Sequence, residues 1–301
     1  MDVFERLNLL KSDITPLKNV PLEKYTTLRV GGPADYFAEP ASQEDLLALL
    51  TAARDAGLPV LLMGNGSNLL VRDGGFRGIV IRLGKAFSEI REKDGLLLAQ
   101  AGALLSGLSR AALEAGLTGL EFAQGIPGTV GGGVYMNAGA YGGEMKQAVA
   151  WVRVLANGEI RTVSGDEMAF GYRHSRAMEE GWLVLEAAFR LNPGDPAAIE
   201  GAMRDFAARR KEKQPLEYPS AGSFFKRPAG HFAGALVEQA GLKGFSVGGA
   251  QVSEKHAGFL VNRGGASAKD FLLLMETVQK RVQAQSGVWL EPEVRIVGED
   301  G

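Results

Sequence analysis

The sequence predicts an α+β protein with more than one domain. Its 301 residues suffice for two or three buried cores. Helical segments alternate with short apolar strands, and the pairs Asp94-Gly95 and Asn157-Gly158 are typical of tight turns in antiparallel hairpins. The 41 glycines gather in clusters between apolar runs rather than in a linker. We therefore expect antiparallel sheet, packed helices and loops whose backbone approaches a ligand.

A first lobe is expected over residues 1–85. Its elements, in chain order, are a short helical arm (1–20), two strands joined by a Gly-Gly turn (25–39), a helix (42–57), a buried strand (59–63), a polar loop (64–68) and a strand pair (69–71 and 78–83). Ser42 is the N-cap of the helix and Gly57 ends it. The order strand, helix, strand predicts a small βαβ-like unit.

A second lobe with a largely antiparallel sheet is expected over residues 86–195. Its elements are a hairpin across Asp94-Gly95, a helix (106–115) capped by Ser106 and stopped by Gly116, an irregular glycine-rich segment (121–143), a hairpin across Asn157-Gly158 (149–164) and a strand (182–191).

The dipeptide Asn192-Pro193 followed by Gly194 is a candidate boundary, and residues 196–301 are expected to form a C-terminal α+β domain. Its elements are an amphipathic helix (196–213), a loop (214–230), a helix (231–240), strands (245–262), a long helix from Ser267 to about residue 285, and a last strand (about 288–298) that is expected to return to the first lobe.

Composition excludes several classes of function. A net charge of -2 argues against a nucleic-acid-binding surface. The absence of cysteine rules out disulfides, thiolate metal sites and a thiol nucleophile, and three histidines make a histidine-rich metal site unlikely to form, so no metal is expected. The N-terminus does not resemble a signal peptide, and no apolar run is long enough to span a membrane. A cytoplasmic protein is expected.

Two glycine-rich segments are candidate sites for a large ligand. In the loop at residues 64–68 (GNGSN), which follows an apolar strand, exposed N–H groups can hold a diphosphate, although an ordinary turn explains this loop equally well. Residues 121–142 are uncharged after Glu121. A buried loop of this length would leave backbone groups unpaired unless a ligand satisfied some of them, which favours a long, flat cofactor.

These two segments resemble the FAD-binding region of vanillyl-alcohol-oxidase-like flavoproteins. More narrowly, the chain from about residue 20 to its end resembles the UDP-N-acetylenolpyruvoylglucosamine reductase (MurB) family. The matching motifs, in the family's order, are YTTLRVGGPA (25–34), GYRHS (171–175), YPSAGSFFKRP (218–228), KHAGF (255–259) and EVRI (293–296). The resemblance implies a two-lobed FAD-binding domain followed by a C-terminal substrate domain.

Only 50 positions separate Arg173 from Ser223, with one helix and one strand to fit between them. The chain therefore resembles the short form of the family, which lacks an inserted loop carrying a tyrosine over the substrate.

The resemblance implies non-covalent FAD, with NADPH and the UDP-sugar using one cleft in turn. The cofactor residues it implies are Gly64, Asn65, Gly66, Ser67, Asn68, Gly125, Ile126, Pro127, Gly128, Gly131, Gly132, Asn137 and Gly139. An oxidase of the wider superfamily is one alternative, but tethered flavin needs His or Cys, and the 64–68 loop has neither.

By the same resemblance, Ser223 donates a proton while Arg173 and Glu293 stabilise an enolate. A glutamate beside an enolate makes electrostatic sense only if it is protonated or hydrogen-bonded to the substrate carboxyl, so its pKa should be raised. Glu291 lies two residues away and is the alternative assignment. A non-catalytic nucleotide-binding module is the alternative from another functional class, and the presence of all three residues argues against it.

The anionic substrates need cationic partners. Lys213, Lys226 and Arg227 flank Ser223, and these three residues and Tyr172 are the expected substrate contacts. For Lys213, a solvated helix end is an equally good interpretation. We expect a monomer whose partners are small molecules.

Overall fold

The first lobe is built on a four-stranded sheet with the order β1-β2-β5-β3. The structure is a computed structural model that describes residue 5 and residues 14–301. The strands are β1 (Leu17–Pro21), β2 (Pro33–Ala38), β3 (Val60–Met63) and β5 (Phe76–Arg82). β2 and β3 both run parallel to β5, and α2 (Gln43–Asp55) connects them, so the predicted βαβ-like unit is confirmed.

The cap of α2 is also as predicted. The Ser42 hydroxyl accepts a hydrogen bond from the Asp45 N–H at 3.1 Å, which satisfies one of the free donors at the helix N-terminus. After the helix, Gly57 adopts a left-handed φ of +67°. The apolar face of α2 buries Leu46 and Leu49 against the sheet.

Two predictions for the first lobe are wrong. Residues 17–21, expected to be helical, form β1, which pairs antiparallel with β2; the rest of the predicted arm lies largely outside the described residues. The first strand expected within 25–39 is absent from this described part of the chain. Instead a 3₁₀ turn η1 (Leu22–Tyr25) leads into a segment that packs behind the 64–68 loop, where the Thr27 N–H donates to the Gly66 carbonyl at 3.3 Å.

The second lobe contains an antiparallel sheet with the order β12-β11-β13-β7-β6. The strands are β6 (Ile90–Lys93), β7 (Leu96–Gln100), β11 (Val149–Ala156), β12 (Glu159–Ser164) and β13 (Leu183–Phe189). Both predicted hairpins form, and Asp94 and Asn157 each have a φ of +53° at their turns. β13 is buried along its whole length because it is the central strand and α4 (Val130–Tyr135) packs against it.

The predicted Ser106 cap is wrong. Helix α3 (Leu105–Glu114) begins one residue earlier, without a side-chain cap. The Leu105 N–H donates instead to the Gly128 carbonyl at 3.0 Å, and the Val130 N–H donates to the Ala103 carbonyl at 2.8 Å. The glycine-rich segment therefore caps α3 and is fixed by it. The short elements of this lobe are η2 (Lys85–Phe87), β8 (Leu117–Thr118), η3 (Glu121–Ala123), β9 (Gly139–Ala140), β10 (Gly143–Glu144), η4 (Met145–Gln147), α5 (Arg176–Glu179) and β14 (Asn192–Pro193).

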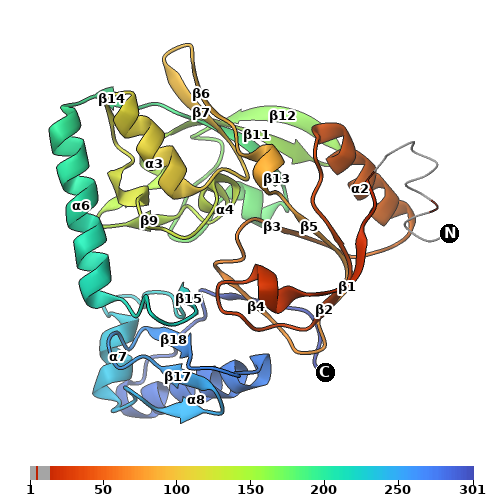
Figure 1. Ribbon diagram of the computed structural model, residues 1–301. Helices are drawn as coiled ribbons and strands as arrows, with labels where there is room; N and C mark the ends of the chain where they lie inside the picture. The colour runs from red at the N-terminus through yellow and green to blue at the C-terminus, as the bar shows by residue number, and fades with distance from the viewer. Residues whose placement is uncertain (1–4, 6–13) are drawn as a thin grey trace.

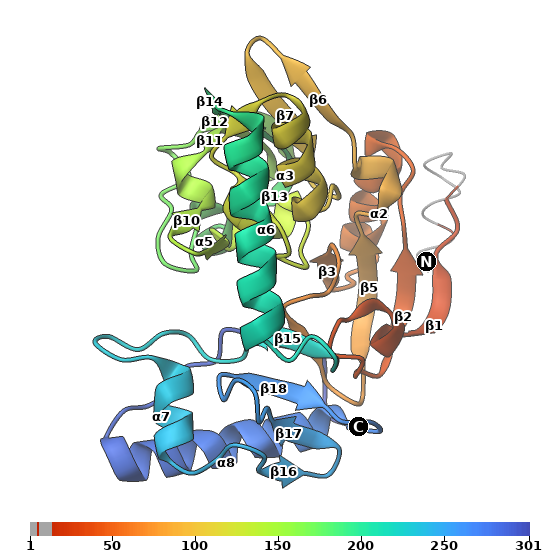
Figure 2. The same ribbon diagram turned by 60° about the vertical axis from the view of Figure 1, so that its left-hand side comes forward.

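The long helix α6 (Pro196–Lys213) has the predicted bounds. Asp195 caps it, accepting a hydrogen bond from the Ala197 N–H at 3.2 Å. Along its length α6 packs against α3 and η3 of the second lobe, and its C-terminal end reaches the C-terminal domain (Figures 1 and 2). We propose that residues 1–85, 86–195 and 196–301 form the three parts of the molecule, with α6 acting as a strut between the last two.

The C-terminal part has an antiparallel sheet with the order β15-β18-β17-β16, covered by two helices (Figure 2). The elements are β15 (Ser220–Ser223), α7 (Ala233–Gln239), β16 (Ser246–Val247), β17 (Ala250–Val252), β18 (Phe259–Asn262) and α8 (Ala268–Ser286). β15 lies inside the segment predicted to be a loop. Phe224 and Phe271, both fully buried, stack at the centre of this core with ring centroids 6.3 Å apart.

One strand pair joins the last strand of the C-terminal part to the first lobe. β19 (Arg295–Val297) pairs in parallel with β4 (Leu69–Val71), directly after the 64–68 loop. The last strand is shorter than predicted, because residues 288–294 run past β15 with only a bridge between Phe225 and Pro292. This arrangement carries Glu293 to the loop that follows β3. In the part of the chain that the structure describes, no helix combines the length and apolarity needed to cross a bilayer.

Candidate active site

All three parts of the molecule contribute to a cleft of about 480 Å³. Its lining includes the 64–68 loop, residues 126–129, 131–133 and 138–140 of the glycine-rich segment, and residues 181–184 of β13 and its approach. The lining also includes several charged or polar residues: Arg173, Arg210, Gln214, Ser223, Glu293 and Arg295. Apolar walls with a few converging charged groups are typical of a cofactor or substrate site.

The 64–68 loop is locked against the glycine-rich segment. The Asn65 side-chain amide donates to the Pro127 carbonyl at 2.8 Å. Gly66 has a φ of +60°, and a Cβ there would lie 2.1 Å from the Tyr25 carbonyl, so only glycine allows this approach. The two predicted cofactor segments therefore form one rigid wall.

The cleft suits an elongated cofactor that carries a diphosphate. Gly128 and Gly132 both line it, and an added Cβ would meet no protein atom closer than 3.5 Å at Gly128 or 3.8 Å at Gly132, so their missing side chains leave room for a ligand. Arg210 and Arg295 supply cationic groups, and the buried Nε of Arg210 has no hydrogen-bond partner among the described residues. These features fit FAD held without a covalent bond.

Arg173 sits at the tip of a tight turn. The N–H and carbonyl groups of Gly171 and His174 bond to each other at 3.0 and 3.2 Å, which leaves Tyr172 and Arg173 as the two central residues. Arg173 has a left-handed φ of +52°, uncommon for a residue with a side chain. Its Nε donates to Oε1 of Glu293 at 2.6 Å. The turn thus aims the guanidinium across the cleft at the C-terminal part.

Glu293 is held by its backbone next to both Ser223 and the cofactor loop. Its N–H donates to the Phe224 carbonyl at 2.9 Å, and its carbonyl accepts from the Asn68 side-chain amide at 3.1 Å. Burial raises the pKa of the Glu293 carboxyl above its ordinary value, while Arg173 and, less strongly, Lys226 pull it down; burial dominates. The direction predicted from the sequence is confirmed.

The alternative carboxylate, Glu291, does not reach the cleft. Its carboxylate pairs with the Lys226 ammonium at 3.2 Å on the surface, and 68% of its side chain is exposed, against 14% for Glu293. Ser223 ends β15, opposite Phe259 of β18, and its side chain is exposed to the cleft. Three residues that are far apart in sequence, Arg173, Ser223 and Glu293, therefore line one cavity.

Most of the expected cofactor residues line this cleft, and two do not. Those that line it are Gly64, Asn65, Gly66, Ser67, Asn68, Ile126, Pro127, Gly128, Gly131, Gly132 and Gly139. Gly125 lies outside the lining, and its carbonyl accepts a hydrogen bond from the Arg210 guanidinium. Asn137 is 1% exposed and its amide bonds only to protein groups.

None of the four expected substrate residues is part of the cleft lining. Lys213 is exposed at the end of α6, and Lys226 pairs with Glu291. The Tyr172 hydroxyl accepts a hydrogen bond from the Arg227 N–H at 2.9 Å, and the Arg227 guanidinium lies 4.0 Å from the centre of the Phe232 ring. Tyr172 is the chain neighbour of Arg173, and Lys213 is the chain neighbour of Gln214, and both of these neighbours line the cleft.

Sequence reasoning missed Arg210, Gln214 and Arg295. Arg295 belongs to the EVRI motif, so its neighbour Glu293 was a usable signal. Arg210 stands in a run of basic residues at the end of α6, where nothing in the sequence distinguishes it from a solvated charge.

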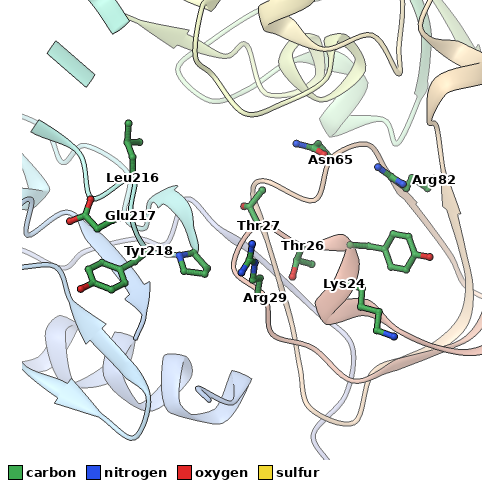
Figure 3. Close-up of a pocket in the computed structure, with 11 residues that line it drawn as sticks. Lys24, Thr26, Thr27, Arg29, Asn65, Arg82, Leu216, Glu217 and Tyr218 are labelled. Carbon is green, nitrogen blue, oxygen red and sulfur yellow. The ribbon is translucent and has the colours of Figure 1, made fainter. Parts of the chain in front are cut away.

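A second cavity of about 490 Å³ lies behind the cofactor loop, between the first lobe and the segment that follows α6 (Figure 3). Its lining is mostly polar and includes Lys24, Arg29, Arg82, Glu217 and Tyr218. Asn65 lines both cavities.

Comparison with known proteins places this architecture. Residues 34–164 match the model of an FAD binding domain, and residues 214–297 match the C-terminal domain of UDP-N-acetylenolpyruvoylglucosamine reductase. Reductases of that name from Agathobacter rectalis and Heliobacterium modesticaldum are 52% and 51% identical, covering 94% and 95% of this chain and 94% and 91% of their own lengths.

A solved structure agrees with the sequence relatives. The crystal structure of UDP-N-acetylenolpyruvylglucosamine reductase (MurB) from Thermus caldophilus superposes with a TM-score of 0.82 at 39% identity, covering 95% of this chain and 100% of that one. The family expected from the motifs is thereby confirmed: the chain belongs to the UDP-N-acetylenolpyruvoylglucosamine reductase family.

Proposed function

We propose that this enzyme reduces the enolpyruvyl ether of UDP-N-acetyl-3-O-(1-carboxyvinyl)-glucosamine to UDP-N-acetylmuramate, a step of peptidoglycan precursor synthesis, at the expense of NADPH. The observation that carries the proposal is the meeting of Arg173, Ser223 and Glu293 in the cleft that both glycine-rich segments line. The match of residues 34–164 to an FAD binding domain identifies FAD as the cofactor.

Saturating the double bond requires a hydride at C3 and a proton at C2. FAD, which the 64–68 loop and the glycine-rich segment would hold, would supply the hydride for C3 after its reduction by NADPH. The Ser223 hydroxyl donates the proton to C2, from its exposed position at the end of β15. Since a serine hydroxyl is a weak acid, it needs the charged groups of the cleft around it to stabilise the alkoxide that remains.

Arg173 and Glu293 hold the developing enolate. The Arg173 guanidinium supplies positive charge where negative charge grows on C2 and its carboxylate. The raised pKa of Glu293 lets its carboxyl keep a proton and donate a hydrogen bond to the substrate rather than repel it. The two side chains also bond to each other, through Nε of Arg173 and Oε1 of Glu293.

Substrate and NADPH are proposed to occupy the same cleft in turn, with Tyr172, Lys213, Lys226 and Arg227 meeting their phosphates at the rim. The 50 positions from Arg173 to Ser223 contain α5, β13, β14, α6 and β15 rather than the one helix and one strand expected, and we propose that the chain is of the short form of the family. We further propose that the enzyme is a cytoplasmic monomer.

The test follows the flavin spectrum of the FAD-loaded protein under anaerobic conditions. NADPH should bleach the flavin absorbance, and the enolpyruvyl UDP-sugar should restore it. Ser223→Ala should bleach normally but recover its colour at least about 100-fold more slowly, whereas the control Ser220→Ala, in the same strand but outside the cleft lining, should behave as the wild type. A protein that cannot be loaded with FAD, or an S223A variant with normal recovery, would contradict the proposal.

A further inference from the structure

The side-chain amide of Asn137 makes its hydrogen bonds within the second lobe. Its Nδ2 donates to the Gly171 carbonyl at 2.9 Å and to the Glu144 carboxylate at 3.1 Å, and its Oδ1 accepts from the Lys146 N–H at 2.9 Å. The residue is 1% exposed. Both amide protons and one lone pair of the amide oxygen are bonded to protein, and Asn137 is not part of the cleft lining, so this side chain is not placed to hold a cofactor.

The bond to Gly171 reaches the base of the turn that presents Arg173. Gly171 and His174 close that turn, and Arg173 at its tip is held in the left-handed region. A second tie lies on the far side, where the buried Ser175 hydroxyl donates to the Tyr135 carbonyl at 2.7 Å. The turn is therefore fastened at both of its ends to α4 and the residues that follow it.

The same segment also lines the cofactor cleft. Gly131, Gly132 and Gly139, on either side of Asn137, are part of its wall, and the Gly139 carbonyl lies 3.5 Å from Nη2 of Arg173. The position of the cofactor wall and the position of the turn that carries Arg173 are therefore coupled. Asn137 links the cofactor wall to the turn that carries Arg173. Its backbone is part of the wall segment, and its side-chain amide bonds to Gly171 at the base of the turn.

We propose that Asn137 is a positioning residue that sets the Arg173 guanidinium against the cofactor wall and Glu293, and that it contacts neither cofactor nor substrate. The proposal rests on the function proposed above, because it assigns Asn137 a role in the step that Arg173 assists. Arg173 is needed when substrate becomes an enolate, and not when NADPH reduces the cofactor. The effect of Asn137 should be confined to the same half of the reaction.

Two substitutions separate loss of the bond from loss of the fold. Asn137 has a φ of +44°, which Gly and Asp both tolerate. Asn137→Gly removes the amide without backbone strain. Asn137→Asp keeps the shape but sets a carboxylate against the Gly171 carbonyl and the Glu144 carboxylate, both of which are acceptors. Asn157→Gly, a change at another left-handed asparagine in an exposed hairpin turn of the same lobe, is the matched control.

Stopped-flow measurement of the two half-reactions is the kinetic test. Both Asn137 variants should be bleached by NADPH within about twofold of the wild-type rate, and should be reoxidised by the enolpyruvyl substrate at least about tenfold more slowly, the scale expected of a misplaced group. In an Arg173→Ala background the Asn137 substitutions should cost less than about twofold more, because Asn137 acts through Arg173. Equal slowing of both half-reactions, or undiminished slowing in the R173A background, overturns the proposal.

A readout without substrate keeps the two proposals distinguishable. The carboxyl ¹³C signal of Glu293, assigned by its loss in Glu293→Gln, reports the titration of that group. If Asn137 positions Arg173, the N137G variant should raise the pKa of Glu293 in the same direction as R173A does, because the guanidinium withdraws. A titration in N137G that matches the wild type refutes the positioning role, whether or not the wild type turns over the UDP-sugar; failure of wild-type turnover alone refutes only the proposed function.

Discussion

At the scale of single residues, Glu293 shows which of two opposed effects prevails in this cleft. An arginine within hydrogen-bond distance lowers the pKa of a carboxyl, and removal from water raises it. Here the second effect is the larger, so the pKa is raised although the Arg173 Nε lies 2.6 Å away. The same partly buried contact keeps the two groups that are proposed to hold the enolate side by side.

The raised pKa predicts a pH-dependent stability. The folded chain holds the Glu293 proton above the ordinary value of 4.5, where the unfolded chain has released it. Stability from this group is therefore fully present below the unfolded pKa and is lost as the pH rises through the folded pKa. We expect Glu293→Gln to flatten this loss when urea unfolding is measured from acidic to neutral pH. Glu291→Gln, at the exposed neighbour, should leave the curve unchanged; parallel curves for E293Q and wild type would contradict the assignment.

Gly132 offers a test of where the cofactor lies. It lines the cleft on α4, and an added Cβ would meet only Thr129 Oγ1, at 3.8 Å. We expect Gly132→Val to fold with a normal melting temperature but to retain less than about a tenth of the FAD, because the side chain fills ligand space. Flavin absorbance after loading and desalting measures this. Gly201→Val, at an open position on α6, is the control and should bind FAD fully.

The sequence could identify the residues of this site but not their partners. Motif order led to Arg173, Ser223 and Glu293, all of which line the cleft, and the role that the resemblance assigns to Glu293 predicted its raised pKa. Asn137 was expected among the cofactor contacts because it sits in the glycine-rich segment. That its amide turns inward to Gly171 depends on a residue 34 positions away, which no local pattern encodes.

At the scale of secondary structure, local chemistry decided which elements were predictable. The hairpins at Asp94 and Asn157 and the helix after Ser42 were predictable because their turns and caps are determined by neighbours in sequence. β1 and β19 were missed or overextended because each is short and gains its partner from a distant segment. β15 has little apolar alternation, so its strand conformation comes from pairing with β18.

Two serines at the starts of helices, Ser267 and Ser106, allow a direct comparison. In α8, Ser267 and Asp270 form a reciprocal capping box, with the Ser267 hydroxyl accepting from the Asp270 N–H at 3.0 Å. Ser106, which also fits the sequence pattern of a cap, caps nothing in α3. We expect Ser267→Ala to lower the free energy of unfolding by about 1 kcal/mol and Ser106→Ala to change it by less than about 0.5 kcal/mol. Chemical denaturation measures both, and equal losses would contradict the capping assignment.

At the scale of the whole molecule, the candidate active site lies where several parts of the molecule meet. Its lining comes from the first lobe, the second lobe, the end of α6 and the C-terminal part. The division into three parts remains a proposal, and the sequence does not predict the angles at which they meet. Those angles depend on contacts such as the Thr27 hydroxyl bond to the Ser220 carbonyl at 2.7 Å, across 193 positions.

Because the cleft is lined by several parts of the molecule, binding of the cofactor should stabilise these parts together. FAD at about a hundredfold excess over its Kd should raise the free energy of unfolding by about 2.7 kcal/mol. Hydrogen exchange should slow together in the segments 64–69, 126–140 and 181–184, which belong to different lobes but line one cleft. Amides of α8 in the C-terminal core serve as the internal control. Protection confined to the first lobe would show that the cofactor does not bridge the lobes.

The parallel pairing of β4 with β19 has a consequence for how the protein is made. β4 is synthesised early, but its partner β19 emerges only after the second lobe, α6 and most of the C-terminal part. Until then one edge of β4 stays open, and the cofactor loop before it lacks the Asn68 bonds to Glu293 and Arg295. An incomplete nascent chain therefore exposes an unpaired strand, which favours association with other chains, and carries no complete catalytic centre. Pairing of β4 and fixing of the cofactor loop therefore depend on the same few residues.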